Sequence, residues 1–162
     1  RVTSGRDVLR SWEDMPVSRV VRIICYSAKG IPGHSLEKVN LMEDMGMEGD
    51  YHATGGERQL TVISQKAKDW IQAQEVEGFC FMKFKENIII DGIFLENLSD
   101  RGKLVMGGVI LELTPVRKKC YAELCKLDQN HENCVLNREV RFAKVTSGGD
   151  ISVGMEVAVS DF

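Results

Sequence analysis

The sequence predicts a mainly β protein whose strands form a closed or strongly curved antiparallel β-barrel with a few short helices. Three observations support this fold class. The 162 residues contain many short apolar and β-branched runs, glycine turns separate these runs, and one segment has a convincing helical pattern. Strands and helices do not alternate along the chain, which disfavours a parallel α/β sheet.

The first predicted elements follow a polar N-terminal stretch. Residues 1–16 lack clear periodicity and are interpreted as a linker or extension, so a single domain is expected over residues 17–162. "SRVVRIICYS" predicts a strand that ends in the glycine- and proline-containing loop "AKGIPGHS". A short strand over Lys38 to Met42, a long glycine-bearing loop and a strand over Gln59 to Ile63 come next. That loop is a candidate functional site, because loops on a rigid scaffold often carry function.

The predicted helix begins after Ser64, whose side chain can cap it. Ala67, Trp70 and Ile71 have approximate one-face spacing, and Gly78 can end the helix. The side chains of Trp70 and Ile71 are therefore expected to pack in the core. The remaining chain predicts strands and glycine turns in "FCFMKFKENIII", "KLVMGGVILELTPV" and "VRFAKVTSGGDISVGMEVAV", with a short helical turn in "FLENLSDRG".

Composition limits the classes of function. The net charge of -3 and the pI of about 5.7 disfavour general binding to nucleic acid or anionic membranes. No apolar run approaches the roughly 18 residues of a membrane span, and the N-terminus lacks the apolar core of a signal peptide. The five cysteines are an odd number, and Cys25 and Cys80 lie in strand-like runs. We therefore expect a cytoplasmic protein with no nucleic-acid or membrane partner.

Three cysteines close together in the sequence form the first candidate site: Cys120, Cys125 and Cys134. Together with His131 they offer a donor set that zinc accepts in a tetrahedron. Their spacing, Cys-x4-Cys-x8-Cys, is looser than the tight cysteine pair of a compact zinc knuckle. A structural zinc is thus one possible interpretation of this cluster.

The same stretch is also a candidate for thiol chemistry. Arg117, Lys118 and Lys119 directly precede Cys120, and Arg138 is nearby in the sequence. Positive charge favours the thiolate, which is the nucleophilic form of cysteine. Cys120 is therefore the best nucleophile candidate, although these residues also fit a packed loop with a solvated basic end.

The second candidate site is the glycine-rich stretch "GMEGDYHATGGERQ". Asp50, His52 and Arg58 there provide a carboxylate, a titratable imidazole and a clamp for an anion. Glycines also let backbone N–H groups approach a ligand closely. An ordinary turn with a loop-capping histidine is the alternative interpretation.

Five segments, taken in order, form a further pattern: "GMEGDYHA" with "ERQLTVIS", "ENIIIDGIFLENL", "KLVMGGVILELTPVRKKC" and "CVLNREVRFAKVTSGGDISVGMEV". Together they resemble the MOSC domain, which is the C-terminal domain of molybdenum cofactor sulfurases and also occurs as small stand-alone bacterial proteins. The resemblance extends from about Val17 to Val159. It departs from the family pattern at Tyr51, where many members have Arg, and at Met155, where Asp is common.

This resemblance implies a β-barrel in which Cys120 carries sulfur or contacts molybdenum. The implied activity is that of a sulfur carrier or transferase that delivers a persulfide sulfur to molybdenum cofactor or a related metal–sulfur acceptor. Cofactor-binding residues would be Arg58, Arg117, Lys118, Arg138, Asp50 and His52, and the candidate metal ligands are Cys120, Cys125 and Cys134. The alternatives are a non-catalytic module that binds and delivers the cofactor and a domain with a structural zinc.

The resemblance also implies partner proteins. Full sulfurases join this domain to a pyridoxal-phosphate cysteine desulfurase, for which this chain is too short, so no pyridoxal phosphate site is expected in it. An external cysteine desulfurase would supply the sulfur. A molybdoenzyme or a cofactor-biosynthesis protein would receive it.

Overall fold

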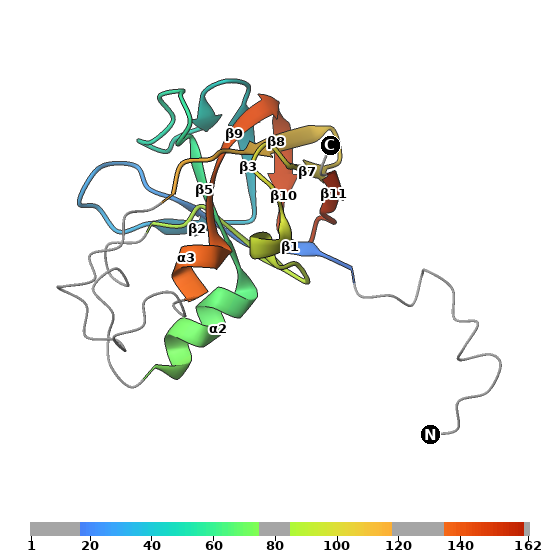
Figure 1. Cartoon of the computed structure of the whole chain (residues 1–162). Coiled ribbons are helices and arrows are strands. Elements are labelled where there is room, and N and C mark those ends of the chain that lie inside the picture. The colour runs from blue at the N-terminus through green and yellow to red at the C-terminus, as the bar shows by residue number, and fades with distance from the viewer. Residues whose placement is uncertain (1–16, 75–84, 118–134, 161–162) are drawn as a thin grey trace, which may run out of the picture.

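The computed structural model describes residues 17–74, 85–117 and 135–160 (Figure 1). The strands are β1 (Arg19–Cys25), β2 (His34–Leu36), β3 (Lys38–Met42), β4 (Gly46–Met47), β5 (Leu60–Ser64), β6 (Ile88–Asp91), β7 (Lys103–Met106), β8 (Val109–Leu113), β9 (Val140–Ser147), β10 (Gly149–Ser152) and β11 (Ala158–Ser160). The helices are α2 (Gln65–Ala73), α3 (Val135–Glu139) and the short 3-10 helix η2 (Leu95–Asn97).

The strands form a strongly curled sheet of eight strands and a smaller sheet of three. The large sheet has the order β11-β7-β8-β9-β5-β6-β1-β2, and the small one has the order β10-β3-β4. An antiparallel bridge between Arg19 and Glu156 and a hydrogen bond from Val20 N to Met155 O (2.9 Å) link β1 to the segment before β11. These contacts connect the two sides of the large sheet, which confirms the predicted mainly β, strongly curved fold class.

One strand pair differs from the antiparallel expectation. β5 and β6 are parallel, with Val62 opposite Ile88 and Ile63 opposite Ile89. Parallel neighbours require a crossover connection, and the chain between these two strands contains α2. The single helix that the sequence predicts is thus the reason why β6 enters the sheet in the same direction as β5.

The start of α2 agrees with the predicted helix. The Ser64 side chain accepts a hydrogen bond from Ala67 N at 3.2 Å and so caps the first turn. The helix ends at Ala73, and Gly78, the predicted stop, lies outside the described residues. Trp70 and Ile71 pack against the core and are only partly buried.

The hairpin between β7 and β8 also confirms a predicted turn. Met106 pairs with Val109, so Gly107 and Gly108 form a two-residue loop. Gly107 has φ +62°, a backbone conformation that residues other than glycine adopt at an energetic cost.

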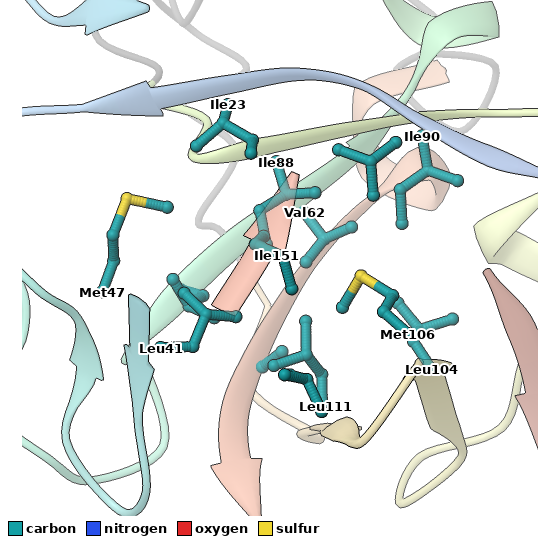
Figure 2. Packing of buried hydrophobic residues seen from close by; sticks show 14 of the residues in the cluster. Ile23, Leu41, Met47, Val62, Ile88, Ile90, Leu104, Met106, Leu111 and Ile151 are labelled. Carbon is teal, nitrogen blue, oxygen red and sulfur yellow. The ribbon is translucent and has the colours of Figure 1, made fainter. Parts of the chain in front are cut away.

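The hydrophobic core has two parts, one on each face of the large sheet. The inner cluster fills the curled sheet, and Figure 2 shows its side chains converging from both sheets, including Leu41, Val62, Ile88, Leu104 and Ile151. The outer cluster packs α2 and α3 against the other face and includes the following residues: Ile24, Tyr26, Ile63, Ala67, Ile89, Val135, Leu136 and Val140. Ile88 and Ile90 face the inner cluster and Ile89 faces the outer one, which is why three successive isoleucines are buried.

We expect Leu104→Ala to lower the free energy of unfolding by about 2–5 kcal/mol, because Leu104 is 0 % exposed and its loss leaves a cavity. Val159 pairs with Leu104 across β7 and β11 but is 43 % exposed. Val159→Ala is the matched control and should cost less than about 0.5 kcal/mol. Urea unfolding measures both changes, and equal losses would contradict the assigned core.

Candidate functional site

Three arginines from different elements line a pocket of about 230 Å³. Arg117 follows β8, Arg138 belongs to α3, and Arg141 lies in β9. Glu96 and Leu98 complete the lining. Guanidinium groups are the side chains best suited to bind phosphate or carboxylate through paired hydrogen bonds, so this pocket is a candidate anion site.

Arg141 is the most buried of the three, with 2 % of its side chain exposed. Its Nη1 donates to the carbonyl oxygens of Leu98 (2.8 Å) and Leu95 (3.3 Å). A buried cation is tolerated only when it is hydrogen-bonded or paired, and these carbonyls meet that need together with Asp100. Arg141 is therefore a fixed group at the inner end of the pocket.

Asp100 joins two of the arginines. Its Oδ1 accepts hydrogen bonds from Nη2 of Arg117 (2.8 Å) and from Nη2 of Arg141 (2.9 Å). The Arg117 Nη1 also donates to Thr114 O at 3.0 Å. The hydrogen bond from Arg117, with the positive charges of Arg117, Arg141 and Arg101, holds the pKa of the Asp100 carboxyl below its usual value. Asp100 thus holds the Arg117 guanidinium close to that of Arg141, which is fixed by its own hydrogen bonds.

Arg138, another arginine that lines the pocket, pairs with Glu96. The Nε of Arg138 lies 3.0 Å from Glu96 Oε2. Buried Glu139 in turn accepts hydrogen bonds from the backbone N–H groups of Leu95 (3.0 Å) and Glu96 (2.9 Å), which fixes the start of η2. Glu96 and Asp100 therefore both form ion pairs with guanidinium groups that line the pocket.

The predicted residues Arg117 and Arg138 thus come together, and the sequence analysis missed Arg141. Arg141 occupies an inward-facing position of β9 together with Ala143 and Val145, which are both 0 % exposed. The position of Arg141 in that alternating pattern of apolar residues is the signal that could have identified it as a buried charged residue.

The predicted thiol residues cannot be placed in the same way. Lys118, Cys120, Cys125 and Cys134 lie outside the described residues. Arg117 is the last described residue before them and precedes Cys120 by three positions. Within residues 17–74, 85–117 and 135–160, no group of three metal-binding side chains is present, and Cys25 is free and buried in β1.

Asp50 and His52 form a second cluster in the glycine-rich loop. The Asp50 side chain is 0 % exposed and makes four hydrogen-bond contacts. Its Oδ2 accepts from Tyr26 N (2.9 Å) and from Asn87 Nδ2 (2.9 Å), and its Oδ1 accepts from His52 N (2.8 Å). The fourth contact joins Asp50 Oδ1 to Nδ1 of His52 at 2.7 Å. Asp50 therefore ties the loop to β1 and to the start of β6.

Aromatic rings surround the imidazole of His52. The Tyr51 ring lies against it with a centroid distance of 3.9 Å, and the Tyr26 ring meets its edge at 6.3 Å. The Lys85 ammonium lies 3.2 Å from Tyr51 Oη. Burial, with the negative charges of Glu86 and Asp50, raises the pKa of Tyr26 to about 12, so this phenol stays protonated at neutral pH.

Arg58 belongs to neither cluster. Its guanidinium lies over the Phe142 ring, 4.9 Å from the centroid. Neighbouring residues of a strand point to opposite faces, so Phe142 faces away from the pocket that holds Arg141. The structure therefore does not bring Arg58 into the lining of the arginine pocket.

Comparison with known protein families decides the classification. The MOSC domain matches residues 49–158, which are 110 of the 162 residues. This chain belongs to the MOSC domain family. The matched region includes the three arginines of the pocket and the pair Asp50 and His52.

Solved structures agree with the MOSC fold. The YuaD protein from Bacillus subtilis is 14 % identical, with a TM-score of 0.65 over 91 % of this chain and 97 % of that one. YiiM from Geobacillus stearothermophilus is 14 % identical, with a TM-score of 0.61 over 88 % of this chain and 74 % of that one. YiiM from Escherichia coli is 16 % identical, with a TM-score of 0.56 over 89 % and 70 %. At these identities the likeness shows the fold.

No curated protein sequence matches this MOSC chain. Among the helices in the described residues, none has the length and apolar character needed to cross a membrane.

We expect NMR titration to give Asp100 a carboxyl pKa below its ordinary value, and Arg117→Gln to raise it because the principal hydrogen bond is lost. Asp150 is the internal control, since hydrogen bonds from Asn40 and Lys38 lower its pKa independently of Arg117. The pKa of Asp150 should stay unchanged in this variant. An Asp100 pKa that does not move would contradict the bridge between the two arginines.

Proposed function

We propose that this MOSC protein is a sulfur carrier that receives sulfur as a persulfide on Cys120 and passes it to molybdenum cofactor or a related metal–sulfur acceptor. The observation that supports this most is the pocket lined by Arg117, Arg138 and Arg141. It lies at the point where the chain enters the segment that contains Cys120. An anionic acceptor bound there would contact Arg117, which precedes the proposed sulfur-carrying residue, Cys120, by three positions in the sequence.

The loading step is a thiol–persulfide exchange with an external cysteine desulfurase. The Cys120 thiolate attacks the outer sulfur of the desulfurase persulfide, a new sulfur–sulfur bond forms, and the bond in the donor breaks. The donor leaves as a thiolate, so atoms and charge balance without an added oxidant. The basic residues Arg117 and Lys118 would favour the thiolate form of Cys120.

The pocket fits the anionic part of the proposed acceptor. Arg117, Arg138 and Arg141 would hold a phosphate group, because guanidinium N–H groups match its oxygens in geometry and charge. When bound, the cofactor would supply a molybdenum centre that accepts the transferred sulfur. Soft metals accept thiolate ligands, so Cys125 or Cys134 would supply a second sulfur contact or resolve the persulfide.

We expect anaerobic incubation with a cysteine desulfurase and cysteine to add the mass of one sulfur atom to the peptide that contains Cys120. Cys120→Ser should abolish this addition, whereas the matched variants Cys125→Ser and Cys134→Ser should still be loaded. Mass spectrometry with peptide mapping gives the readout. If the Cys120→Ser protein still delivers cofactor, the chain is a binding module, and zinc released only on unfolding would make the cysteine cluster structural.

We expect Arg138→Gln to weaken binding of molybdopterin by roughly 10- to 100-fold, the value of one charge-assisted hydrogen bond to phosphate. Arg22→Gln is the matched control, because Arg22 lies on β1 and its Nε donates to Ser35 Oγ, away from the pocket. Isothermal titration calorimetry measures both affinities. Equal affinity in the Arg138→Gln and wild-type proteins would contradict the assignment of this pocket as the anion site.

A further inference from the structure

The contact between Asp50 and His52 determines which imidazole nitrogen carries the proton. Each of the other three contacts to the Asp50 carboxylate comes from an N–H donor, on Tyr26, His52 and Asn87. An ionised carboxylate only accepts hydrogen bonds, so Nδ1 of His52 must also be a donor at its 2.7 Å distance. The neutral ring therefore has its lone pair on Nε2.

The second nitrogen of this imidazole, Nε2, is open to a ligand. Among the described residues Nε2 has no hydrogen-bond partner, and it is not buried. The whole His52 side chain is 32 % exposed, and the hydrogen bond to Asp50 and the ring of Tyr51 hold its orientation. An imidazole fixed in this way accepts a hydrogen bond through Nε2 when it is neutral and donates one when it is protonated.

Two further hydrogen-bond donors lie beside the imidazole. The Tyr51 ring lies against the His52 ring with a centroid distance of 3.9 Å, and the Lys85 ammonium donates to Tyr51 Oη at 3.2 Å. Because the phenol oxygen accepts this bond, its own proton is left for another acceptor. Lys85 also lies 5.7 Å from the centre of the Tyr26 ring, which meets the edge of the His52 ring. The polar ends of His52, Tyr51 and Lys85 therefore form one patch.

The carboxylates near this patch are already bonded to other groups. No carboxylate of the described residues forms an ion pair with Lys85, and neighbouring Glu86 pairs with Lys68 at 2.8 Å. Asp50 is 0 % exposed, and its oxygens face the N–H donors given above. The other charged or titratable groups around the patch are those of Arg22, Tyr26 and Tyr51. An anion at the patch would therefore contact an ammonium group, a phenol and an imidazole.

We propose that His52, Tyr51 and Lys85 bind a tetrahedral oxyanion of the phosphate or sulfate class, and that Nε2 of His52 shares one proton with an oxygen of this anion. A tetrahedral oxyanion offers an oxygen to each of the three side chains, whereas a carboxylate has only two oxygens. None of the residues that line the arginine pocket belongs to this patch, so it is a second anion site. The inference goes beyond the sulfur-carrier function and does not depend on it.

The shared proton makes binding depend on pH in a way that differs between anions. Sulfate carries no proton in this range, so it needs the protonated imidazole, and its affinity should fall as the pH rises. Hydrogen phosphate keeps one O–H group that can donate to the neutral imidazole. A phosphate monoester loses its last proton with a pKa of about 6 and should behave like sulfate at high pH. Histidine ordinarily changes its charge in this range, whereas carboxylates, phenols, ammonium and guanidinium groups titrate outside it.

The test follows the imidazole signals of His52 by NMR while sulfate, inorganic phosphate or glycerol phosphate is added at about pH 6 and about pH 9, at constant ionic strength. These signals report on this patch even if the arginine pocket binds the same anions. We expect sulfate to bind roughly tenfold or more weakly at the higher pH, where phosphate should bind roughly tenfold more tightly than sulfate. If glycerol phosphate binds more tightly than phosphate at the lower pH, the ligand is a phosphorylated compound, and the opposite order identifies free phosphate.

Two variants separate the roles of the imidazole and the ammonium group. His52→Gln keeps an amide that can donate but does not titrate, so its sulfate affinity, followed through the Tyr51 ring signals, should differ by less than about twofold between the two pH values. Lys85→Gln should weaken sulfate binding roughly tenfold at both pH values and keep the pH dependence. Lys38→Gln is the matched control, because Lys38 lies on β3 and pairs with Asp150. Circular dichroism establishes that each variant is folded.

His34 is the internal control, because it is an exposed histidine on β2, outside both candidate sites. Its signals should not respond to the anions. If the His52 signals do not move, or move only as much as those of His34, the patch binds no oxyanion and the inference is overturned. Sulfate binding that is independent of pH in the wild-type protein would likewise overturn the shared proton. Each of these results leaves the proposed sulfur-carrier function unaffected.

Discussion

Burying the Arg141 guanidinium imposes a constraint on which much of this end of the barrel depends. An arginine at an inward-facing strand position must find hydrogen-bond acceptors, because an unsatisfied buried charge is strongly destabilising. The carbonyls of Leu95 and Leu98 provide them, and Asp100 provides a counter-charge. The segment from η2 to Asp100 is therefore held against β9, and this position of Asp100 in turn orients Arg117.

Asp50 has a corresponding role at the glycine-rich loop. Its carboxylate takes the place of a backbone partner for Tyr26 N and also accepts a hydrogen bond from Asn87. Asn87 itself donates to Ile24 O and accepts from Thr61 N, so it connects β1 with β5. Two buried charges, one cationic and one anionic, thus organise the two polar clusters of a protein whose stability comes mainly from apolar packing.

Local features of the sequence were sufficient to predict most of the fold. The Ser64 cap, the Gly107–Gly108 turn and the strand over Lys38 to Met42 depend on neighbouring residues, and the structure contains all three. The parallel pairing of β5 and β6 was not predicted, because it depends on how a crossover packs onto the sheet. Local patterns do not contain that information.

The candidate site was harder to predict, because its parts come from distant positions in the chain. Arg117 and Arg138 drew attention through the basic residues around the cysteines, but Asp100 and Glu96 join them only in three dimensions. Arg141 had a recognisable signal in the alternation of β9. Asp50 and His52 were identified as a pair of titratable residues, whereas the number of donors that Asp50 satisfies required the structure.

The contact between Arg19 and Glu156 has a consequence for how the protein folds. These residues are 137 positions apart, and the neighbouring backbone hydrogen bonds of Val20 and Met155 span a similar separation. Contacts between such distant residues form slowly, because a long loop must close before they contribute any stabilisation. During synthesis on the ribosome, nearly the whole domain must be made before β1 can form these contacts and this side of the barrel can close.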